Sequence, residues 1–192
     1  MDFGRLSPQL LQRCLTQPGG YAWWYLDLVD PLGNGLVCLW SWGLPFLPGS
    51  REGRAAAARP AVGLALYEGG KVRAYLLQEH PLQTNCIPNT DGNARLGDST
   101  FEVCRANGQL ALHLELDEVV PPGRERLHAR VRVTGVEAEL PDAPADSPHL
   151  WTPRLLHARA SAEVRLGARH FELEGVGYFD GNAATVPLHA QG

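Results

Sequence analysis

Apolar and polar side chains alternate one by one along several stretches of the chain, which is the spacing of a β-strand with one buried face. Between residues 109 and 118, leucines occupy every second position, and small or polar side chains occupy the positions between them. The leucines are Leu110, Leu112, Leu114 and Leu116. The small or polar residues that alternate with them are Ala111, His113, Glu115 and Asp117. Residues 127–140 alternate similarly, with Ala129, Val131 and Val133 opposite His128, Arg130 and Arg132. These stretches predict half-buried strands.

Short turns separate the alternating stretches into hairpins. Residues 62–79 turn at Gly69-Gly70, residues 101–119 turn at Asn107-Gly108, and residues 160–179 turn at Gly167. Paired glycine or Asn-Gly supplies the positive φ angles that tight hairpin turns require. No amphipathic helix lies between these predicted strands, which argues against a parallel α/β sheet.

The first part of the chain departs from this alternation. "SPQLLQRCLTQPGG" predicts a short helix that Ser7 caps, that begins with Pro8 and that ends before Pro18. Then "YAWWYLDLV" and "LVCLWSWGL" flank an Asn34-Gly35 turn and are apolar on both faces, so they predict a hairpin buried on both sides. Asp27 is the exception, because it falls on the face of Tyr21, Trp23 and Tyr25.

The predicted fold class is all-β: an antiparallel barrel or sandwich with a short N-terminal helix. We expect one β domain over residues 1–192, with the helix and lead-in at 1–18 and the sheet at 19–192. Residues 45–60 and 80–99 are irregular, and long loops of this kind often cover a binding site. Residues 140–149 form a shorter connection rich in Pro and Asp.

Composition narrows the class of protein. The 192 residues are 44% hydrophobic and carry a net charge of −4 with acidic and basic residues interspersed, which argues against nucleic-acid binding. No apolar run approaches the roughly 20 residues that cross a bilayer, and the N-terminus lacks the apolar core of a signal peptide. The four cysteines form no C-x-x-C pair, so we expect reduced, mostly buried thiols in a cytoplasmic protein.

Three groups of residues could carry chemistry. The aromatic residues Tyr21, Trp23, Trp24, Tyr25, Trp40 and Trp42 lie on two adjacent predicted strands, and they either pack a core or line a cavity for an apolar ligand. His149 and Trp151 are two residues apart and share a face if they lie on a strand; the histidine either positions a water or simply ends a loop. The histidines show no metal-ligand spacing, and no metal site is expected.

The third group lies in "GVGYFDGN", residues 175–182. Asp180-Gly181 is a hairpin-turn signal, so Asp180 either shapes a turn or, beside Tyr178, acts as a proton donor. Asn182 adds another polar group, and the glycines suit either the close approach of a ligand or a bend. The pattern leaves both interpretations open.

The order of these pieces resembles the carotenoid 1,2-hydratase family, a lipocalin-like group whose relatives include terpenoid cyclases and pericyclases. The resemblance rests on "PGGYAWWYLDLVDPLGNGLVCLWSW", "PHLWTP" and "GVGYFDGNAATVPLH", and it runs from about Pro18 to His189. The family's H-x-W and Y-x-D motifs correspond to His149 and Trp151, and to Tyr178 and Asp180. The family usually reads Y-H-D-H-N where this chain has Phe179 and Gly181 as the neighbours of Asp180. Family members generally have two lipocalin-like lobes, and this sequence stops just after the Y-x-D region, which leaves three alternatives: a fragment without the C-terminal lobe, a shortened natural form, or a protein that completes its cavity by self-association.

The resemblance implies hydration of a terminal C=C of an acyclic carotenoid or terpenoid without a cofactor. Asp180 would protonate the alkene, Trp151 and Tyr178 would stabilise the tertiary carbocation, and His149 would orient or deprotonate the water. Trp23, Tyr25, Trp40, Trp42 and Asn182 are the expected substrate-binding residues. The expected partner is a lipophilic small molecule, with peripheral membrane contact and self-association through open sheet edges as further expectations. A terpenoid or polyketide cyclase and a non-catalytic lipocalin-like carrier remain alternatives.

Overall fold

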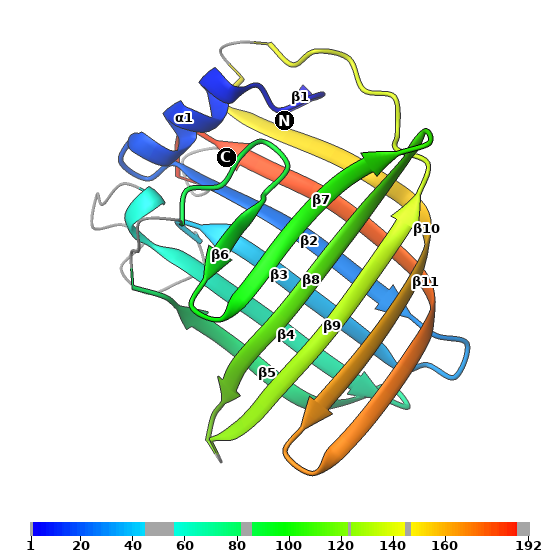
Figure 1. The fold of residues 1–192 in the computed structure, drawn as a ribbon. Coiled ribbons are helices and arrows are strands. Elements are labelled where there is room, and N and C mark those ends of the chain that lie inside the picture. The colour runs from blue at the N-terminus through cyan, green and yellow to red at the C-terminus, as the bar shows by residue number, and fades with distance from the viewer. Residues whose placement is uncertain (1, 45–55, 82–85, 123, 145–146, 188–192) are drawn as a thin grey trace.

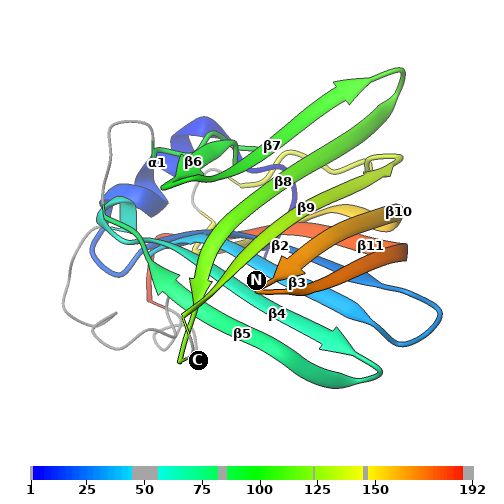
Figure 2. The same cartoon turned by 60° about the horizontal axis from the view of Figure 1, so that its bottom comes forward.

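The chain forms a continuous sheet that curls into a half-barrel, with a short helix at one end (Figures 1 and 2). A computed structural model describes residues 2–44, 56–81, 86–122, 124–144 and 147–187. Neighbouring strands follow the order β5-β4-β3-β2-β11-β10-β9-β8-β7-β6, and β1 pairs with β10. The elements are β1 (Asp2–Phe3), α1 (Pro8–Thr16), β2 (Tyr21–Val29), β3 (Gly35–Trp42), the 3-10 turn η1 (Ala56–Ala58), β4 (Pro60–Glu68), β5 (Lys71–Glu79), β6 (Ala94–Leu96), β7 (Ser99–Ala106), β8 (Gln109–Val120), β9 (Glu125–Gly135), β10 (His149–Leu166) and β11 (Arg169–Ala184).

All strand pairs are antiparallel except β1 with β10, which is parallel. The predicted fold class, an antiparallel all-β barrel or sandwich with a short N-terminal helix, is therefore confirmed. The predicted turns are confirmed at Gly69-Gly70, Asn107-Gly108 and Gly167. Asn107 and Gly108 both have positive φ angles, 53° and 74°, as the Asn-Gly signal requires.

Helix α1 begins and ends as its sequence predicts. The Ser7 hydroxyl accepts a hydrogen bond from the Leu10 amide at 3.2 Å, and Pro8 occupies the first turn, where no backbone donor is needed. The helix buries Leu10, Leu11, Cys14 and Leu15. This apolar side packs against β2, β11 and η1 and closes one end of the half-barrel.

The sheet has two faces with different roles. The inner face lines the concave side and forms the core, where Trp40 stacks on Phe101 of β7 with ring centroids 5.7 Å apart. The opposite side is the outer face. Along β2, Trp24, Leu26 and Leu28 point inward and are buried, whereas Trp23, Tyr25 and Asp27 point outward and are half-buried.

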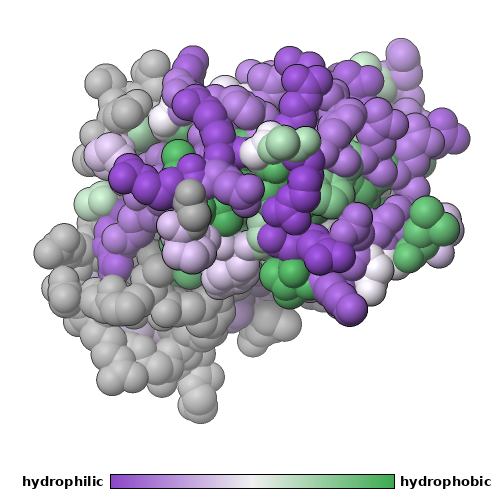
Figure 3. All heavy atoms as spheres, turned by 90° about the horizontal axis from the view of Figure 1, so that it is seen from below, coloured by the Kyte–Doolittle hydropathy of each residue, from purple (hydrophilic) through white to green (hydrophobic). Residues whose placement is uncertain are grey.

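The outer face changes character along the sheet. Over β8, β9 and the distal parts of β10 and β11 it carries charged residues in cross-strand pairs, such as Glu115 opposite Arg130. Over β2 to β5 it carries mainly apolar and aromatic side chains, including Leu39 and Tyr75. The view from below (Figure 3) shows mostly hydrophilic side chains, with hydrophobic groups visible between them.

The two predicted irregular stretches contain more structure than expected where they are described. Residues 45–55 and 82–85 lie outside the described residues. In the remainder, η1 precedes β4, which already begins at Pro60, and the short strand β6 falls within 80–99. Three of the cysteines, Cys14, Cys38 and Cys86, are buried, and Cys104 is exposed, so the thiols are mostly buried as expected. No helix in the described residues is long and apolar enough to span a membrane.

Candidate functional site

Asp180 lies in the last third of β11, and its side chain is on the outer face of the sheet. The register pairs Asp180 with Tyr25 of β2 on one side and with Pro153 of β10 on the other. Since β11 continues from Arg169 to Ala184, Asp180-Gly181 is not a turn, and the hairpin interpretation of this dipeptide is wrong. The carboxyl is buried, with 8% of the residue exposed, although it lies on the outer side.

Three donors contact the Asp180 carboxyl. The Trp151 indole N–H donates to Oδ2 at 2.8 Å, and the Tyr178 hydroxyl donates to the same oxygen at 2.7 Å. The Asn182 amide donates to Oδ1 at 3.2 Å. Tyr178, Asp180 and Asn182 share a face because side chains two residues apart on a strand point the same way. The two carboxyl oxygens therefore differ: Oδ2 holds two short bonds, and Oδ1 holds one longer bond.

His149 joins this group through Asn182. Its Nε2 lies 3.4 Å from Asn182 Oδ1, and its ring meets Tyr21 edge-on with centroids 6.1 Å apart. The same asparagine thus contacts the carboxyl with its amide nitrogen and the imidazole with its amide oxygen. The structure brings His149, Trp151, Tyr178, Asp180 and Asn182 together on β10 and β11.

Two further residues belong to this group, although sequence reasoning did not assign them a role. Asp27 of β2 accepts a hydrogen bond from Tyr25 at 3.0 Å and lies opposite Tyr178. Phe3 of β1 lies 6.2 Å from Trp151, ring centroid to ring centroid. Asp27 carries a sequence signal, since Tyr25 and Asp27 repeat the Y-x-D spacing of the site. Phe3 carries none, because a two-residue strand leaves no periodic pattern.

Burial raises the pKa of Asp180 above its ordinary range. The hydrogen bonds from Tyr178 and Trp151 act in the opposite direction because they favour the carboxylate, while the charge of Asp27 adds to the rise. Burial, together with the neighbouring carboxyls, also raises the pKa values of the Tyr178 and Tyr25 hydroxyls. Both phenols therefore remain hydrogen-bond donors across the physiological range.

The predicted aromatic residues divide between the two faces. Trp23 and Tyr25 lie on the outer face beside the site, where Trp23 pairs in register with Asn182 and stacks on Tyr21 at 4.8 Å. Trp40 and Trp42 lie on the inner face and are fully buried in the core. The structure does not bring those two tryptophans to Asp180. The reason is that β3 is apolar on both sides, so its pattern could not tell which residues face the core.

The glycines and the neighbours of Asp180 also have structural roles on this sheet. A side chain at Gly175 would place its Cβ 2.0 Å from the Val29 carbonyl oxygen, so the close approach here is that of strand β2. Phe179 points inward and packs on Phe101 at 5.9 Å. Gly181 faces inward too, towards Trp24 and Thr152. Neither position is directed at the Asp180 carboxyl.

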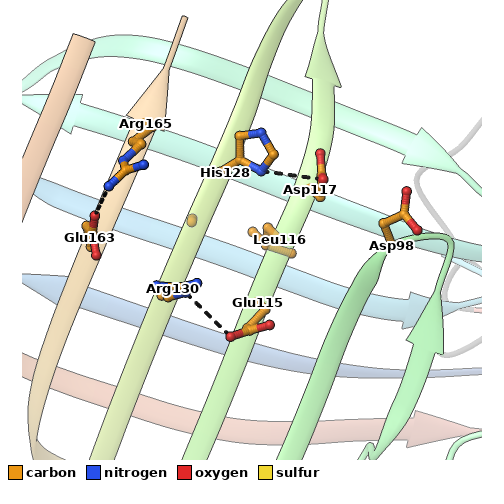
Figure 4. A pocket seen from close by; sticks show the side chains of 9 residues that line it. Asp98, Glu115, Leu116, Asp117, His128, Arg130, Glu163 and Arg165 are labelled. Atoms are coloured by element: carbon orange, nitrogen blue, oxygen red, sulfur yellow. Dashed lines mark hydrogen bonds and ion pairs between the residues drawn. The ribbon is translucent and has the colours of Figure 1, made fainter. Parts of the chain in front are cut away.

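A separate hollow of about 310 Å³ lies on the charged part of the outer face (Figure 4). Its acidic and basic side chains contact one another: Glu163 with Arg165 at 3.0 Å, and Glu115 with Arg130 at 3.5 Å. Pairs of this kind on a solvated strand face add little to stability and offer no poised acid. In the part of the chain that the structure describes, no cluster of three His, Cys, Asp or Glu residues is placed to hold a metal.

Comparison with known proteins points to one kind of fold. No family model matches the chain. The acyclic carotenoid 1,2-hydratase of Thiocapsa roseopersicina is 29% identical over 182 residues, an alignment that covers 89% of this chain and 42% of the hydratase. A protein described as AttH from Nitrosomonas europaea matches with a TM-score of 0.54 and 14% identity, over 88% of this chain and 52% of that one.

The crystal structure of CghA with Sch210972 matches with a TM-score of 0.56 and 16% identity, over 88% of this chain and 47% of that one. The chain therefore spans about half the length of the structures it matches, and less than half of the hydratase. The structural matches support a lipocalin-like antiparallel fold. The sequence match is a distant similarity to a hydratase that extends over most of this chain.

Proposed function

We propose that this protein adds water to a terminal C=C of an acyclic carotenoid or terpenoid, with Asp180 as the proton donor. The observation that carries the proposal is the buried Asp180 carboxyl, held between Trp151 and Tyr178 on an aromatic outer face. The distant similarity to an acyclic carotenoid 1,2-hydratase supports the same reaction. The lipocalin-like fold is compatible with a lipophilic substrate.

The first step requires a carboxylic acid that keeps its proton near neutral pH, because an isolated alkene is a very weak base. Burial raises the pKa of Asp180 and so favours this form. The proton belongs on Oδ1, since Oδ2 already accepts the two short bonds from Trp151 and Tyr178. Transfer of that proton to the less substituted carbon of the terminal C=C breaks the O–H bond, forms a C–H bond and leaves a tertiary carbocation on the other alkene carbon.

The cation forms beside aromatic rings. Tyr178 and Tyr25 lie 6.2 Å apart, ring centroid to ring centroid, and Trp151 borders them from β10. The π face of an aromatic ring stabilises an adjacent cation by about 0.5–2 kcal/mol, and more when water is excluded. The Asp180 carboxylate that remains after proton transfer is itself stabilised by its three hydrogen bonds.

The second step adds water to the cation. In this proposal His149 accepts a proton from that water, which is supported by its position on the same face and its link to Asp180 through Asn182. The product is a tertiary alcohol, and the net reaction consumes one alkene and one water. Asp180 and His149 then exchange protons with solvent and return to their starting forms.

The differences from the hydratase motif do not weaken this assignment. Phe179 and Gly181 stand where the family carries histidines, but both face the inner side of the sheet. The outer-face residues His149, Trp151 and Tyr178, which correspond to the family's H-x-W and Y-x-D motifs, all contact Asp180 or its partner Asn182.

The test is an assay of purified protein with lycopene or neurosporene dispersed in detergent, with the products analysed by mass spectrometry. We expect a product whose mass exceeds that of the substrate by one water. The rate should be at least about 100-fold lower for Asp180→Asn, because asparagine has nearly the same shape as aspartic acid but no acidic proton to transfer. Glu172→Gln, an exposed change on the same strand, should leave the rate unchanged. Full activity in folded Asp180→Asn would exclude the proposed acid.

A non-catalytic carrier is the second candidate, and a specific observation favours it. Three donors converge on Asp180, and such donors stabilise a carboxylate rather than an acid. In a carrier, the affinity for a carotenoid would survive Asp180→Asn and no product would form. A cyclised product of unchanged mass would instead identify a cyclase that uses the same acid.

A further inference from the structure

The Tyr-x-Asp sequence occurs twice on adjacent strands. Tyr25-Leu26-Asp27 lies on β2, and Tyr178-Phe179-Asp180 lies on β11. The antiparallel register pairs Tyr25 with Asp180 and Tyr178 with Asp27, so the tyrosine of each sequence lies opposite the aspartate of the other. All four of these outer side chains share one face of the sheet.

Each tyrosine is bonded within its own strand. Tyr25 donates its hydroxyl to Asp27 Oδ2 at 3.0 Å, and Tyr178 donates its hydroxyl to Asp180 Oδ2 at 2.7 Å. The two rings have centroids 6.2 Å apart and planes tilted by 58°. The register therefore holds both carboxyls on one small aromatic surface, diagonally across a pair of tyrosines.

Among the described residues, the neighbours of Asp180 provide no positively charged side chain that would offset the charge of a second carboxylate. Its own strand presents Tyr178 and Asn182. Strand β10 presents Trp151 directly and His149 through Asn182, and β2 presents Tyr25 and Asp27. In the described residues, no Arg or Lys forms an ion pair with either carboxyl. Asp27 is thus the acidic group among these neighbours, and its charge has the same sign as that of ionised Asp180.

We propose that Asp27 is a positioning residue for the acid: its negative charge on the neighbouring strand keeps the proton on Asp180. Two nearby carboxyls resist simultaneous ionisation, and the more buried one retains its proton. Asp180 is the more buried, at 8% exposed, whereas Asp27 is half-buried. The catalytic meaning of this inference rests on the proposed function, but the electrostatic coupling itself does not.

The burial of Asp180 supports the same assignment of roles. Burial is the largest cause of its raised pKa, and the Asp27 charge acts in the same direction. The donors Tyr178, Trp151 and Asn182 act against both. Removing the Asp27 charge should therefore shift the balance towards the carboxylate.

The test is a titration of the Asp180 carboxyl by NMR of protein labelled with ¹³C at the aspartate carboxyl carbon. The signal is identified by its loss in Asp180→Asn. In Asp27→Asn, we expect the Asp180 midpoint to fall by about one pH unit, a tenfold change in its protonation equilibrium. Asn is close in shape to Asp and can still accept the Tyr25 hydrogen bond.

Three further variants separate charge from structure. Asp27→Glu keeps the charge and should keep the midpoint within a few tenths of a unit. Tyr25→Phe removes the hydrogen bond but not the charge, so the midpoint should not fall. Glu172→Gln removes a distant exposed charge from β11 and should have no effect. An unchanged Asp180 midpoint in Asp27→Asn would overturn the inference.

The titration does not depend on turnover. A failure of the Asp27–Asp180 coupling can therefore be distinguished from a failure of the proposed hydratase function. If the midpoint falls in Asp27→Asn but no variant or parent hydrates a carotenoid, the coupling stands and the hydratase proposal fails. If the parent is active, the alkaline limb of its pH–rate profile should move to lower pH in Asp27→Asn, in step with the midpoint. If Asp27→Asn is active and neither its alkaline limb nor its Asp180 midpoint moves, Asp180 acts as an acid without the influence of Asp27, and the inference is overturned.

Discussion

Trp151 and Trp42 each donate an indole N–H, but to acceptors that give the two residues different roles. Trp151 donates to the Asp180 carboxyl at 2.8 Å. That bond stabilises the carboxylate, so Trp151→Phe should raise the pKa of Asp180 further, the opposite direction from Asp27→Asn. The same carboxyl titration by NMR measures it. A midpoint that falls in Trp151→Phe would contradict the assigned contact.

Trp42 donates to the backbone oxygen of Cys86 at 2.7 Å in the core. Trp42→Phe leaves that oxygen unpaired and removes buried ring surface, so the free energy of unfolding should fall by about 2–4 kcal/mol. Urea denaturation followed by circular dichroism measures the loss. The Asp180 midpoint should not move, because Trp42 lies on the inner face. A moved midpoint would show that Trp42 acts on the site after all.

The strands β2 and β11 set the geometry of the site through their close contact. A Cβ added at Gly175 would lie 2.0 Å from the carbonyl oxygen of Val29, and neither backbone can yield without separating the two strands. Gly175→Ala should therefore lower the free energy of unfolding by about 1–3 kcal/mol or more, as measured by urea denaturation. Stability within about 0.5 kcal/mol of the parent would mean that the strands adjust freely.

Element by element, the sequence predicted what depends on local pattern and missed what depends on pairing between distant strands. The turns at Gly69-Gly70, Asn107-Gly108 and Gly167 and the shared face of His149 and Trp151 follow from local pattern, and they were predicted. The inward direction of Trp40 and Trp42 was not, because β3 is apolar on both sides. The pairing of Asp27 with Tyr178 joins strands about 150 residues apart, and no local signal determines that register.

At the scale of the whole molecule, the fold class was predictable and the position of the site was not. Alternating strands separated by tight turns specify an antiparallel sheet. Which side of that sheet becomes concave depends on how the full sheet curls, which is a property of all its strands together. The structure places Asp180 on the outer face of the sheet, among half-buried aromatic residues, and no local pattern in the sequence predicts that side.

A network of charges joins distant parts of the chain at one end of the half-barrel. Arg105 of β7 contacts Asp91 at 2.9 Å and Glu137 at 2.7 Å, and buried Arg154 of β10 contacts Asp91 at 3.0 Å. Burial acts to raise the pKa values of Asp91 and Glu137, but the two arginines outweigh it and hold both below their ordinary range. The network therefore favours the folded state only while these carboxyls are ionised.

This network predicts a particular loss of stability in acid. Since the folded pKa values of Asp91 and Glu137 are depressed, their contribution is complete above the unfolded values near pH 4 and is lost as the pH falls through the folded values. Asp91→Asn combined with Glu137→Gln should be destabilised most above about pH 5, and its unfolding curve should approach that of the parent as the pH falls through the depressed folded pKa values of the two carboxyls. Urea denaturation across this pH range measures the difference. Glu172→Gln, which lies outside the network, should follow the parent throughout, and a pH-independent gap between parent and double variant would contradict the role assigned to these two carboxyls.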